Sequence, residues 1–297
     1  MSYGRRLRTL LETDDIVVAP GVHDPLSARV ADAVGFDLVA MTGNGTSLAK
    51  IGHPDVGVLA LPEMVENAKY IQQAVDIPII ADADNGFGNA VNVARTVSEF
   101  AAAGVGAIHI EDQVFPKRCG FVEGKRVISK EEAVGKFRAA VDRRDDLGSE
   151  MLVIARTDAR SAVDGSLDDA IDRVNAYCAA GADVAFVQGA RDVDELARVG
   201  EEVDAPLLYN CSGGSPVVPI DRAAELGYDI VIFPRLSTLP TITALFERFG
   251  QLHDEGMDAW TETKAAFEAA PVESYDHFSG VPDVLEWEET YIPADVE

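Results

Sequence analysis

The sequence predicts an α/β fold, a (β/α)8 barrel of the TIM type with extra C-terminal helices. Short apolar, β-branched segments alternate eight times with amphipathic segments, and nearly continuous apolar strands indicate a parallel sheet covered by helices. A count of eight favours closure into a barrel over an open, doubly wound sheet, which is the alternative. The predicted strands are residues 16–20, 38–43, 77–84, 107–112, 152–159, 184–189, 206–210 and 230–234.

Apolar residues at helical spacing follow the predicted strands. We expect the barrel to occupy residues 1–240 and to form the catalytic domain. Residues 241–297 contain more helical pattern than the barrel needs, so we expect a C-terminal helical extension that packs on another surface. The clearest helical segments are 62–76, 91–104, 246–256 and 259–270.

Composition narrows the class of protein. Among 297 residues there is no apolar run long enough to span a membrane and no leader-like start at Met1, so we expect a cytoplasmic protein without a membrane partner. Cys119, Cys178 and Cys211 lack paired spacing, which predicts free thiols. The net charge of −26 disfavours nucleic acid as a partner.

The acidic residues are spread through the chain, and seven lysines stand against eighteen arginines. An acidic, lysine-poor surface stays hydrated when salt screens its self-repulsion. We therefore infer a halophilic protein from a high-salt cytoplasm. The alternative is an ordinary acidic enzyme of a mesophile.

Polar residues gather at the carboxyl ends of the predicted strands, where barrel enzymes build their active sites. They are Thr42, Gly43 and Asn44, Asp82 and Asp84, Glu111, Arg156 and Asp158, Gln188, Asn210 and Ser212, and Pro234 and Arg235. Any one of them can be polar simply because a strand leaves the core there. Residues at i and i+2 are more informative, since such spacing aims two side chains to one side of a strand.

Asp82 and Asp84 form the strongest such pair. Two carboxylates in one cavity repel each other unless a cation or shared proton intervenes, and oxygen ligands suit Mg²⁺ or Mn²⁺. We therefore predict a divalent metal and an anionic, chelating substrate. Arg156 offers a bidentate clamp for a carboxylate, and the TGNG segment from Thr42 offers N–H groups and a hydroxyl.

Glu111 is either a base or a residue that supports the metal. His109 lies in the middle of a predicted strand and is expected to be a core residue, while the role of His53 is open. Cys119 lies in EDQVFPKRCGFVEGK, a segment too polar and too glycine-rich for a helix or strand interior. That setting suggests a reactive thiol on a loop, and the alternative is an unremarkable surface cysteine.

The segments TGNG, GHPDVG, ADADNGFGN, HIEDQ, PKRCG, IARTDA and YNCS, in this order, resemble the isocitrate lyase and phosphoenolpyruvate mutase superfamily. The resemblance covers roughly residues 15–240 and is strongest to the 2-methylisocitrate lyases. It implies a Mg²⁺-dependent barrel that exchanges a C-terminal helix with a neighbouring subunit in a homo-oligomer, usually a tetramer.

The resemblance also implies residue roles. Asp82, Asp84 and Asp55 would bind the metal, with Glu111 in the same acidic group. Cys119 would be the catalytic cysteine. The substrate-binding residues would be Thr42, Gly43, Asn44, Arg156, Asn210 and Ser212, and Gln188 stands at a further strand end of this site.

The implied chemistry is a retro-aldol cleavage of a 2-hydroxy tricarboxylate, most readily 2-methylisocitrate to pyruvate and succinate, with isocitrate next. It needs a base for the hydroxyl proton, a metal for the nascent oxo acid and an acid for the carbanion. Cys119 is the expected acid, with its pKa lowered by Lys117 and Arg118.

Departures from the family pattern limit this expectation. Phe121 replaces a histidine, Ala40 a tyrosine and Gln188 a glutamate, and Arg235 is unexpected; these changes leave the base and the substrate open. Oxaloacetate and dimethylmalate are alternative substrates. Phosphoenolpyruvate mutase-like P–C chemistry ranks lower because this loop has a cysteine, and a non-catalytic barrel that binds an oxo acid ranks last.

The charge of the chain generates the first prediction. The melting temperature should rise between 0.1 M and 1 M KCl, because the Debye length shortens from about 10 Å to about 3 Å and self-repulsion weakens. Thermal unfolding followed by circular dichroism at both salt concentrations measures the change. An unchanged melting temperature would remove the halophile inference.

Overall fold

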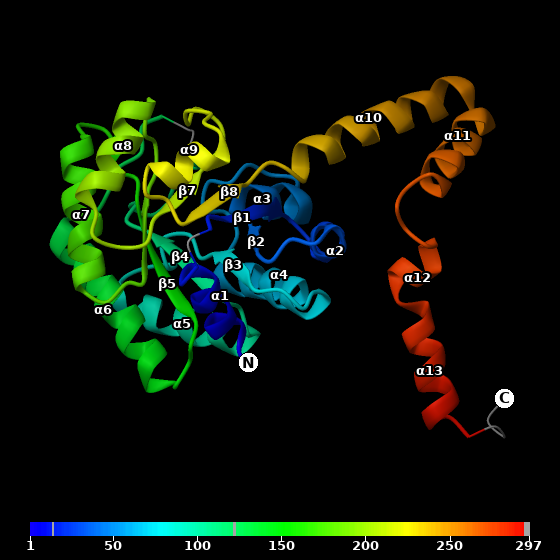
Figure 1. The fold of residues 1–297 in the computed structure, drawn as a ribbon, viewed down its shortest axis with the longest axis horizontal. Coiled ribbons are helices and arrows are strands. Elements are labelled where there is room, and N and C mark those ends of the chain that lie inside the picture. Colours follow the sequence, from blue (N-terminus) through cyan, green and yellow to red (C-terminus); the bar gives the residue numbers. More distant parts are fainter. Residues whose placement is uncertain (14, 121–122, 294–297) are drawn as a thin grey trace. The chain divides into compact units, whose positions relative to one another are not determined.

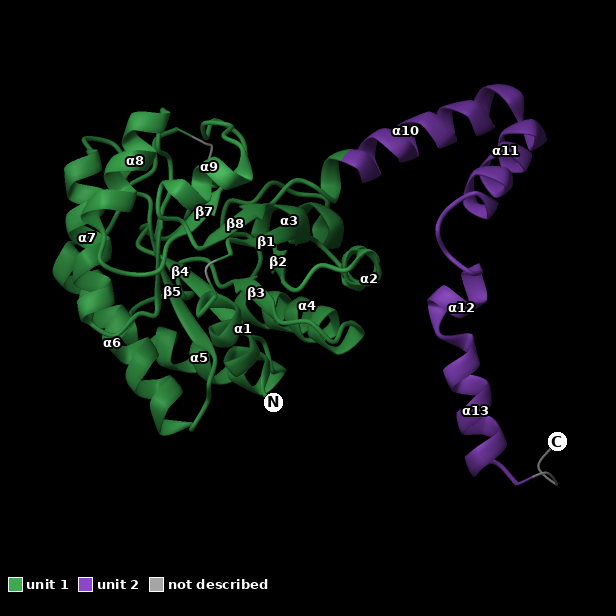
Figure 2. Ribbon diagram, viewed as in Figure 1, with its two compact units in different colours: residues 1–239 green, residues 240–297 purple. Residues whose placement is uncertain are grey.

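The computed structural model describes residues 1–13, 15–120 and 123–293. The chain divides into two compact units, residues 1–239 and 240–297, coloured separately in Figure 2. Unit 1 contains all eight strands found in the described residues, whereas the described part of unit 2 contains helices and their connections.

The strands of unit 1 form a nearly closed parallel barrel (Figure 1). Their hydrogen-bonded order is β6-β5-β4-β3-β2-β1-β8-β7, and a parallel bridge between Ala185 and Leu207 joins β6 to β7. That bridge confirms the predicted barrel and rules out the open sheet. The strands are β1 Val17–Val22, β2 Val39–Met41, β3 Ile79–Asp82, β4 Ala107–Glu111, β5 Leu152–Thr157, β6 Val184–Val187, β7 Leu208–Asn210 and β8 Ile230–Phe233.

Helices connect the strands and cover the barrel. They are α2 Pro25–Val34, α3 Gly43–Ile51, α4 Leu61–Ala74, α5 Ala90–Ala103, α6 Lys130–Asp146, the 3-10 turn η1 Ala159–Ser161, α7 Leu167–Ala179, α8 Val193–Glu202 and α9 Ile220–Glu225. A further helix, α1 Tyr3–Leu11, was not predicted; its Leu7 is buried among barrel-lining residues from the starts of the strands. In the part of the chain that the structure describes, no helix is both long and apolar enough to cross a membrane.

Side chains alternate between the inside and the outside of the barrel. Leu152 and Ile154 belong to the small cluster that fills the barrel, whereas Val153 and Ala155 belong to the larger cluster under the helices. Successive side chains of a strand point to opposite faces. The residue that continues the inward series, Arg156, must therefore point inside the barrel at its carboxyl end.

Unit 2 consists of the greater part of α10 Thr238–Glu255, followed by α11 Met257–Glu268, α12 Tyr275–Ser279 and α13 Val281–Tyr291. Among its described residues, Ala259 is the one buried hydrophobic residue, so these helices have almost no core of their own. Large apolar side chains are exposed instead, including Phe246, Phe249, Met257, Trp260, Trp287 and Tyr291.

Candidate active site

A pocket opens at the carboxyl ends of the strands, where the inward series of side chains becomes polar. Two residues after the inward-facing Ile80, Ile154 and Leu208, the strands carry Asp82, Arg156 and Asn210 respectively. Ile80, Ile154 and Leu208 all belong to the cluster inside the barrel. The pocket is lined by Ala40, Met41, Thr42, Asn44, Asp55, Asp82, His109, Cys119, Gly120, Arg156, Phe186, Gln188, Asn210, Ile232 and Pro234.

Asp82 is held at the pocket by backbone donors. Its Oδ1 accepts a hydrogen bond of 2.9 Å from the Asp84 N–H, and its Oδ2 accepts one of 3.1 Å from the Gly43 N–H. A Cβ at Gly43 would lie 2.3 Å from Oδ2, so only glycine permits this approach. Burial raises the pKa of Asp82, but the charges of His109, Lys117 and Arg156 and the Asp84 N–H together lower it to about 2.

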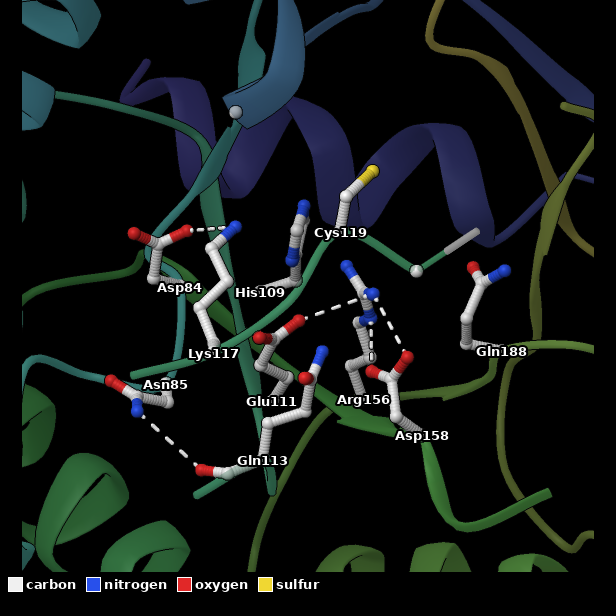
Figure 3. A network of polar contacts seen from close by, with 12 residues as sticks. Asp84, Asn85, His109, Glu111, Gln113, Lys117, Cys119, Arg156, Asp158 and Gln188 are labelled. Atoms are coloured by element: carbon white, nitrogen blue, oxygen red, sulfur yellow. Dashed lines mark hydrogen bonds and ion pairs between the residues drawn. The ribbon is translucent and has the colours of Figure 1, made fainter. Parts of the chain in front are cut away.

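Lys117 is buried beside two further carboxylates. Its Nζ is 2.6 Å from Asp84 Oδ1 and also forms an ion pair with Asp55 (Figure 3 shows the Asp84 pair). Burial and the neighbouring charges of Asp82 and Asp55 raise the pKa of Asp84 to about 7, although Lys117 opposes the shift. Burial lowers the pKa of Lys117, yet these carboxylates outweigh it and raise the pKa well above its usual value.

Arg156 forms a second buried charge cluster. Its Nε donates to Asp158 Oδ2 at 2.9 Å, and its Nη2 lies 3.2 Å from Asp158 Oδ1 and 3.1 Å from Glu111 Oε2 (Figure 3). Burial raises the pKa of Asp158, but Arg156 and Lys125 lower it below its usual value. Glu111 is 1% exposed, and burial raises its pKa well above the usual value despite Arg156.

Cys119 reaches the pocket from the segment between β4 and α6. Its Sγ lies 4.0 Å from Asn44 Nδ2. Gln113 fixes the preceding residue, since its side-chain amide accepts from the Arg118 N–H at 2.9 Å and donates to the Arg118 carbonyl at 2.8 Å. The Lys117 ammonium pairs with Asp55 and Asp84, and Arg118 Nη1 donates to the Glu123 carbonyl.

Two amides and a hydroxyl lie at the carboxyl ends of β6 and β7, on Gln188, Asn210 and Ser212. Asn210 Nδ2 donates to Gln188 Oε1 at 2.9 Å. Asn210 Oδ1 and Ser212 Oγ are buried without a hydrogen-bond partner in the described structure. Buried polar groups are normally satisfied, so these two atoms are suited to receive polar groups of a ligand.

The TGNG segment lines the pocket and also supports neighbouring structure through its hydrogen bonds. Thr42 is the N-cap of α3, and its side chain accepts from the Gly45 N–H. The hydroxyl expected to bind substrate therefore caps the helix. Thr42 and Asn44 nevertheless line the pocket, while Gly43 acts on Asp82.

His109 is buried within β4, as expected, but it also faces the pocket. It continues the inward series from Ala107 to Glu111, lines the pocket, and has its Nδ1 3.7 Å from Asp82 Oδ1. Burial lowers its pKa to about 4, so it is neutral near pH 7. The i+2 spacing from Glu111 was the signal that could have found it.

Other contributors were missed because their role depends on packing. Phe186 lies under Arg156, with its ring centroid 5.2 Å from the guanidinium carbon, and Lys125 and Gln113 act from beside the pocket. Ala40 and Gln188 line the pocket as the sequence suggested. Phe121 lies outside the described residues.

The three aspartates assigned to a metal do not form a ready-made ligand set. In the described residues no three His, Cys, Asp or Glu side chains come together in that way, and Lys117 pairs with both Asp55 and Asp84. Mg²⁺ typically uses one or two carboxylates and keeps several waters. Asp82 faces the pocket and is ionised. Two backbone N–H groups occupy two of the about four acceptor positions of its carboxylate, which leaves the others for an ion. The residues therefore fit a Mg²⁺ or Mn²⁺ ion held mainly by Asp82.

The Lys117 cluster generates a stability prediction. In chelator-treated protein, Lys117→Met should lower the melting temperature by about 5–15 °C, because breaking a buried ion pair costs about 3–5 kcal/mol. Differential scanning calorimetry measures this change. Lys50→Met is the control, since Lys50 pairs with the exposed Glu66 and such pairs are worth under about 1 kcal/mol. Equal melting temperatures for the two variants would contradict the assignment.

Comparison with known proteins places the chain in a family. The family model described as phosphoenolpyruvate phosphomutase matches residues 7–253. The chain is 40% identical to 2,3-dimethylmalate lyase of Eubacterium barkeri over 98% of this chain and 99% of that protein. It is 44% identical to 2-methylisocitrate lyase of Aeropyrum pernix over 78% and 73% of the two chains.

Solved structures agree. Oxaloacetate acetylhydrolase in complex with 3,3-difluorooxalacetate superposes with a TM-score of 0.88 at 35% identity, covering 97% of each chain. Phosphonopyruvate hydrolase in complex with oxalate and Mg²⁺ superposes with a TM-score of 0.87 at 30% identity, covering 99% of this chain and 100% of that one. With its barrel, its polar mouth and these matches, the chain belongs to the phosphoenolpyruvate mutase/isocitrate lyase superfamily.

Proposed function

We propose that this protein is a divalent-metal-dependent C–C lyase that cleaves a 2-hydroxy acid by a retro-aldol reaction and releases a 2-oxo acid. The observation that carries the proposal is the convergence, on one pocket, of an ionised aspartate, a buried arginine and a cysteine: Asp82, Arg156 and Cys119. The lyases among the relatives act on acids of this class by name.

A Mg²⁺ or Mn²⁺ ion at this site would supply positive charge for the developing 2-oxo acid. Asp82 would hold the ion, and the carboxylates of Asp84 and Asp55, which pair with Lys117 beside it, would add negative charge to its surroundings. Arg156 would bind a substrate carboxylate, while Asn210 and Ser212 would donate to or accept from the substrate through the atoms that have no partner.

The proton steps fall to two residues. Glu111 is the candidate base for the substrate hydroxyl, because its raised pKa makes the ionised carboxylate a stronger base. When the bond between C2 and C3 breaks, its electrons remain on the departing carbon, and the Cys119 thiol at the pocket would give that carbon a proton. Glu111 then releases the proton it took and the thiolate takes one up, both by exchange with solvent, which restores the enzyme.

We further propose a substrate with a methyl group on its 2-hydroxy carbon, namely 2-methylisocitrate, which yields pyruvate and succinate. Ala40, Met41, Phe186 and Ile232 give the pocket an apolar part that suits such a group. The second candidate is 2,3-dimethylmalate, which yields pyruvate and propionate. It is favoured by the pocket's charge, since Arg156 is the one lysine or arginine among the described lining residues and already faces two carboxylates.

The lyase proposal predicts pyruvate release from 2-methylisocitrate or 2,3-dimethylmalate, faster than cleavage of isocitrate or oxaloacetate. Cys119→Ser should slow turnover by at least about a hundredfold, since a positioned general acid contributes 10² to 10⁴ in rate. Pyruvate is followed with lactate dehydrogenase, and the second product identifies the substrate.

Cys178→Ser is the matched control, because Cys178 lies on α7 outside the pocket; it should retain turnover. No cleavage of any of the four acids would refute the lyase proposal. Near-normal turnover by Cys119→Ser would instead remove the thiol from the proton step.

The metal proposal predicts loss of turnover on exhaustive chelation and recovery with Mg²⁺ or Mn²⁺. Asp82→Asn should weaken metal binding, measured by titration calorimetry, because the amide removes the charge that faces the ion. Asp37→Asn, at an exposed aspartate, is the control. Full activity in the presence of chelator would exclude a metal requirement.

We also propose that residues 241–297 pack on a neighbouring subunit in a homo-oligomer, usually a tetramer as in the family. The exposed apolar side chains of α10, α11 and α13 support this proposal, because helices without a core of their own need a covering surface.

This arrangement predicts a smaller species for a charged substitution in the full-length chain. Phe246→Glu, at a phenylalanine 80% exposed on α10, should shift the mass measured by light scattering towards dimer or monomer. His253→Glu adds a similar charge at an exposed site of the same helix and should not. An unchanged mass for Phe246→Glu, or a monomeric wild-type protein, would refute the proposal.

A further inference from the structure

Lys125 is a buried lysine in a chain that has few lysines. All seven lie in the described residues, and three of them, Lys117, Lys125 and Lys136, are at most 3% exposed. A buried ammonium is costly unless it is paired and hydrogen-bonded. The partners of the Lys125 ammonium therefore indicate the role of this buried side chain.

The Lys125 ammonium joins two parts of the pocket wall. Its Nζ donates to the Gly120 carbonyl and to Asp158 Oδ1 at 3.1 Å. Gly120 directly follows Cys119, and Asp158 is the carboxylate that binds Arg156 on both oxygens. One side chain thus links the residue next to the thiol with the partner of the substrate-binding arginine.

Gly120 also lies close to this arginine. A Cβ built on Gly120 would lie 2.9 Å from Arg156 Nη2 and 3.2 Å from Gln188 Cδ. The backbone at Gly120 therefore lies against both side chains with no room for a methyl group. Gly120, Lys125, Asp158 and Arg156 form a closed ring of contacts.

The ring is anchored to the barrel through Asp158. Its side chain is fully buried, and its backbone N–H donates to Asp112 Oδ1 at 3.0 Å. Asp112 in turn accepts from Thr157 Oγ1 at 2.7 Å and from the Tyr177 hydroxyl at 2.8 Å. Asp158 is thus a fixed point, and Lys125 transmits its position to Gly120.

We propose that Lys125 is a positioning residue. By linking the Gly120 carbonyl to Asp158, it holds the Cys119 thiol at the pocket in a fixed position relative to Arg156. The proposal deepens the proposed function, on which its effect on turnover rests. The placement of the thiol itself is measured without any substrate.

The alternative role for Lys125 is neutralisation of a buried carboxylate. Arg156 already contacts both oxygens of Asp158, and neutralisation alone would not require the bond to Gly120. The two roles differ in outcome. Loss of a neutralising charge weakens the whole barrel, whereas loss of a positioning contact changes the accessibility of Cys119 alone.

The test measures alkylation of each cysteine by iodoacetamide in the full-length, ligand-free protein, with peptides quantified by mass spectrometry. In Lys125→Met, iodoacetamide should alkylate Cys119 about tenfold faster than in the wild type. The reason is that losing a charge-assisted hydrogen bond of about 1.4 kcal/mol changes an equilibrium population by a factor of ten. Cys178 serves as the internal reference, since burial raises its pKa to about 11 and its rate reports opening of α7.

Three further variants complete the test. Gly120→Ala displaces the Gly120 backbone, because its Cβ would lie 2.9 Å from Arg156 Nη2, and should also speed alkylation of Cys119 while Lys125 stays paired with Asp158. Lys125→Gln, whose side chain is shorter and uncharged, replaces Lys125→Met if that variant does not fold. Lys130→Met is the control, because Lys130 pairs with Asp172 at the surface, and it should match wild type.

Faster alkylation confined to Cys119 supports the proposal, and Lys125→Met should then also lower kcat about tenfold with whichever acid the wild type cleaves. Equal Cys119 rates in wild type and in Lys125→Met, or in Lys125→Gln where that variant replaces it, would overturn it. So would acceleration of Cys119 and Cys178 by the same factor. If the wild type cleaves none of the tested acids, the proposed function fails while the alkylation ratio still decides the role of Lys125.

Discussion

The alternation of side chains along parallel strands is the constraint on which this structure depends. In each strand every second residue points into the barrel, and the inward series starts apolar and becomes polar at the carboxyl end. Ile80 leads to Asp82, and Leu152 and Ile154 lead to Arg156. The packing that fills the barrel therefore also directs the functional groups toward one pocket. The apolar core and the charged pocket are the two ends of the same series of inward-facing side chains.

Placing several charges at the end of a buried row has an electrostatic consequence. Asp82, Asp84, Glu111 and Asp158 are all at most 6% exposed, and such carboxylates are tolerated only with cations and hydrogen-bond donors nearby. Lys117 pairs with Asp84, and Arg156 pairs with Glu111 and Asp158. Burial and the charges of Asp82 and Asp55 raise the pKa of Asp84 to about 7, whereas nearby positive charges and the Asp84 N–H bring the pKa of Asp82 to about 2. An ionised metal ligand and protonatable neighbours can thus coexist within one site.

The segment that carries Cys119 is tied to the barrel through side chains acting on its backbone. The Gln113 amide pairs with both backbone groups of Arg118, and Lys125 binds the Gly120 carbonyl. A thiol flanked by two such attachments keeps its position without depending on regular secondary structure. These attachments come from Gln113 at the end of β4 and from Lys125 before α6, so the loop is held by residues that flank it in sequence.

The sequence by itself determined the barrel, because eight apolar segments of strand length between helical patterns leave few other ways to bury their faces. It also pointed to Asp82 and Arg156 at the carboxyl ends of their strands, and both line the pocket. Asp84 follows the end of β3 at a positive φ and does not line the pocket, so its position depends on the turn after the strand. The sequence did not reveal the inward position of His109, although the same spacing from Glu111 applied. Only the tertiary structure decided that Lys117 pairs with Asp55 and Asp84 and that Lys125 reaches Asp158. The physical reason is that a long side chain from a loop finds its partner through the folded path of the backbone, which no local pattern in the sequence specifies.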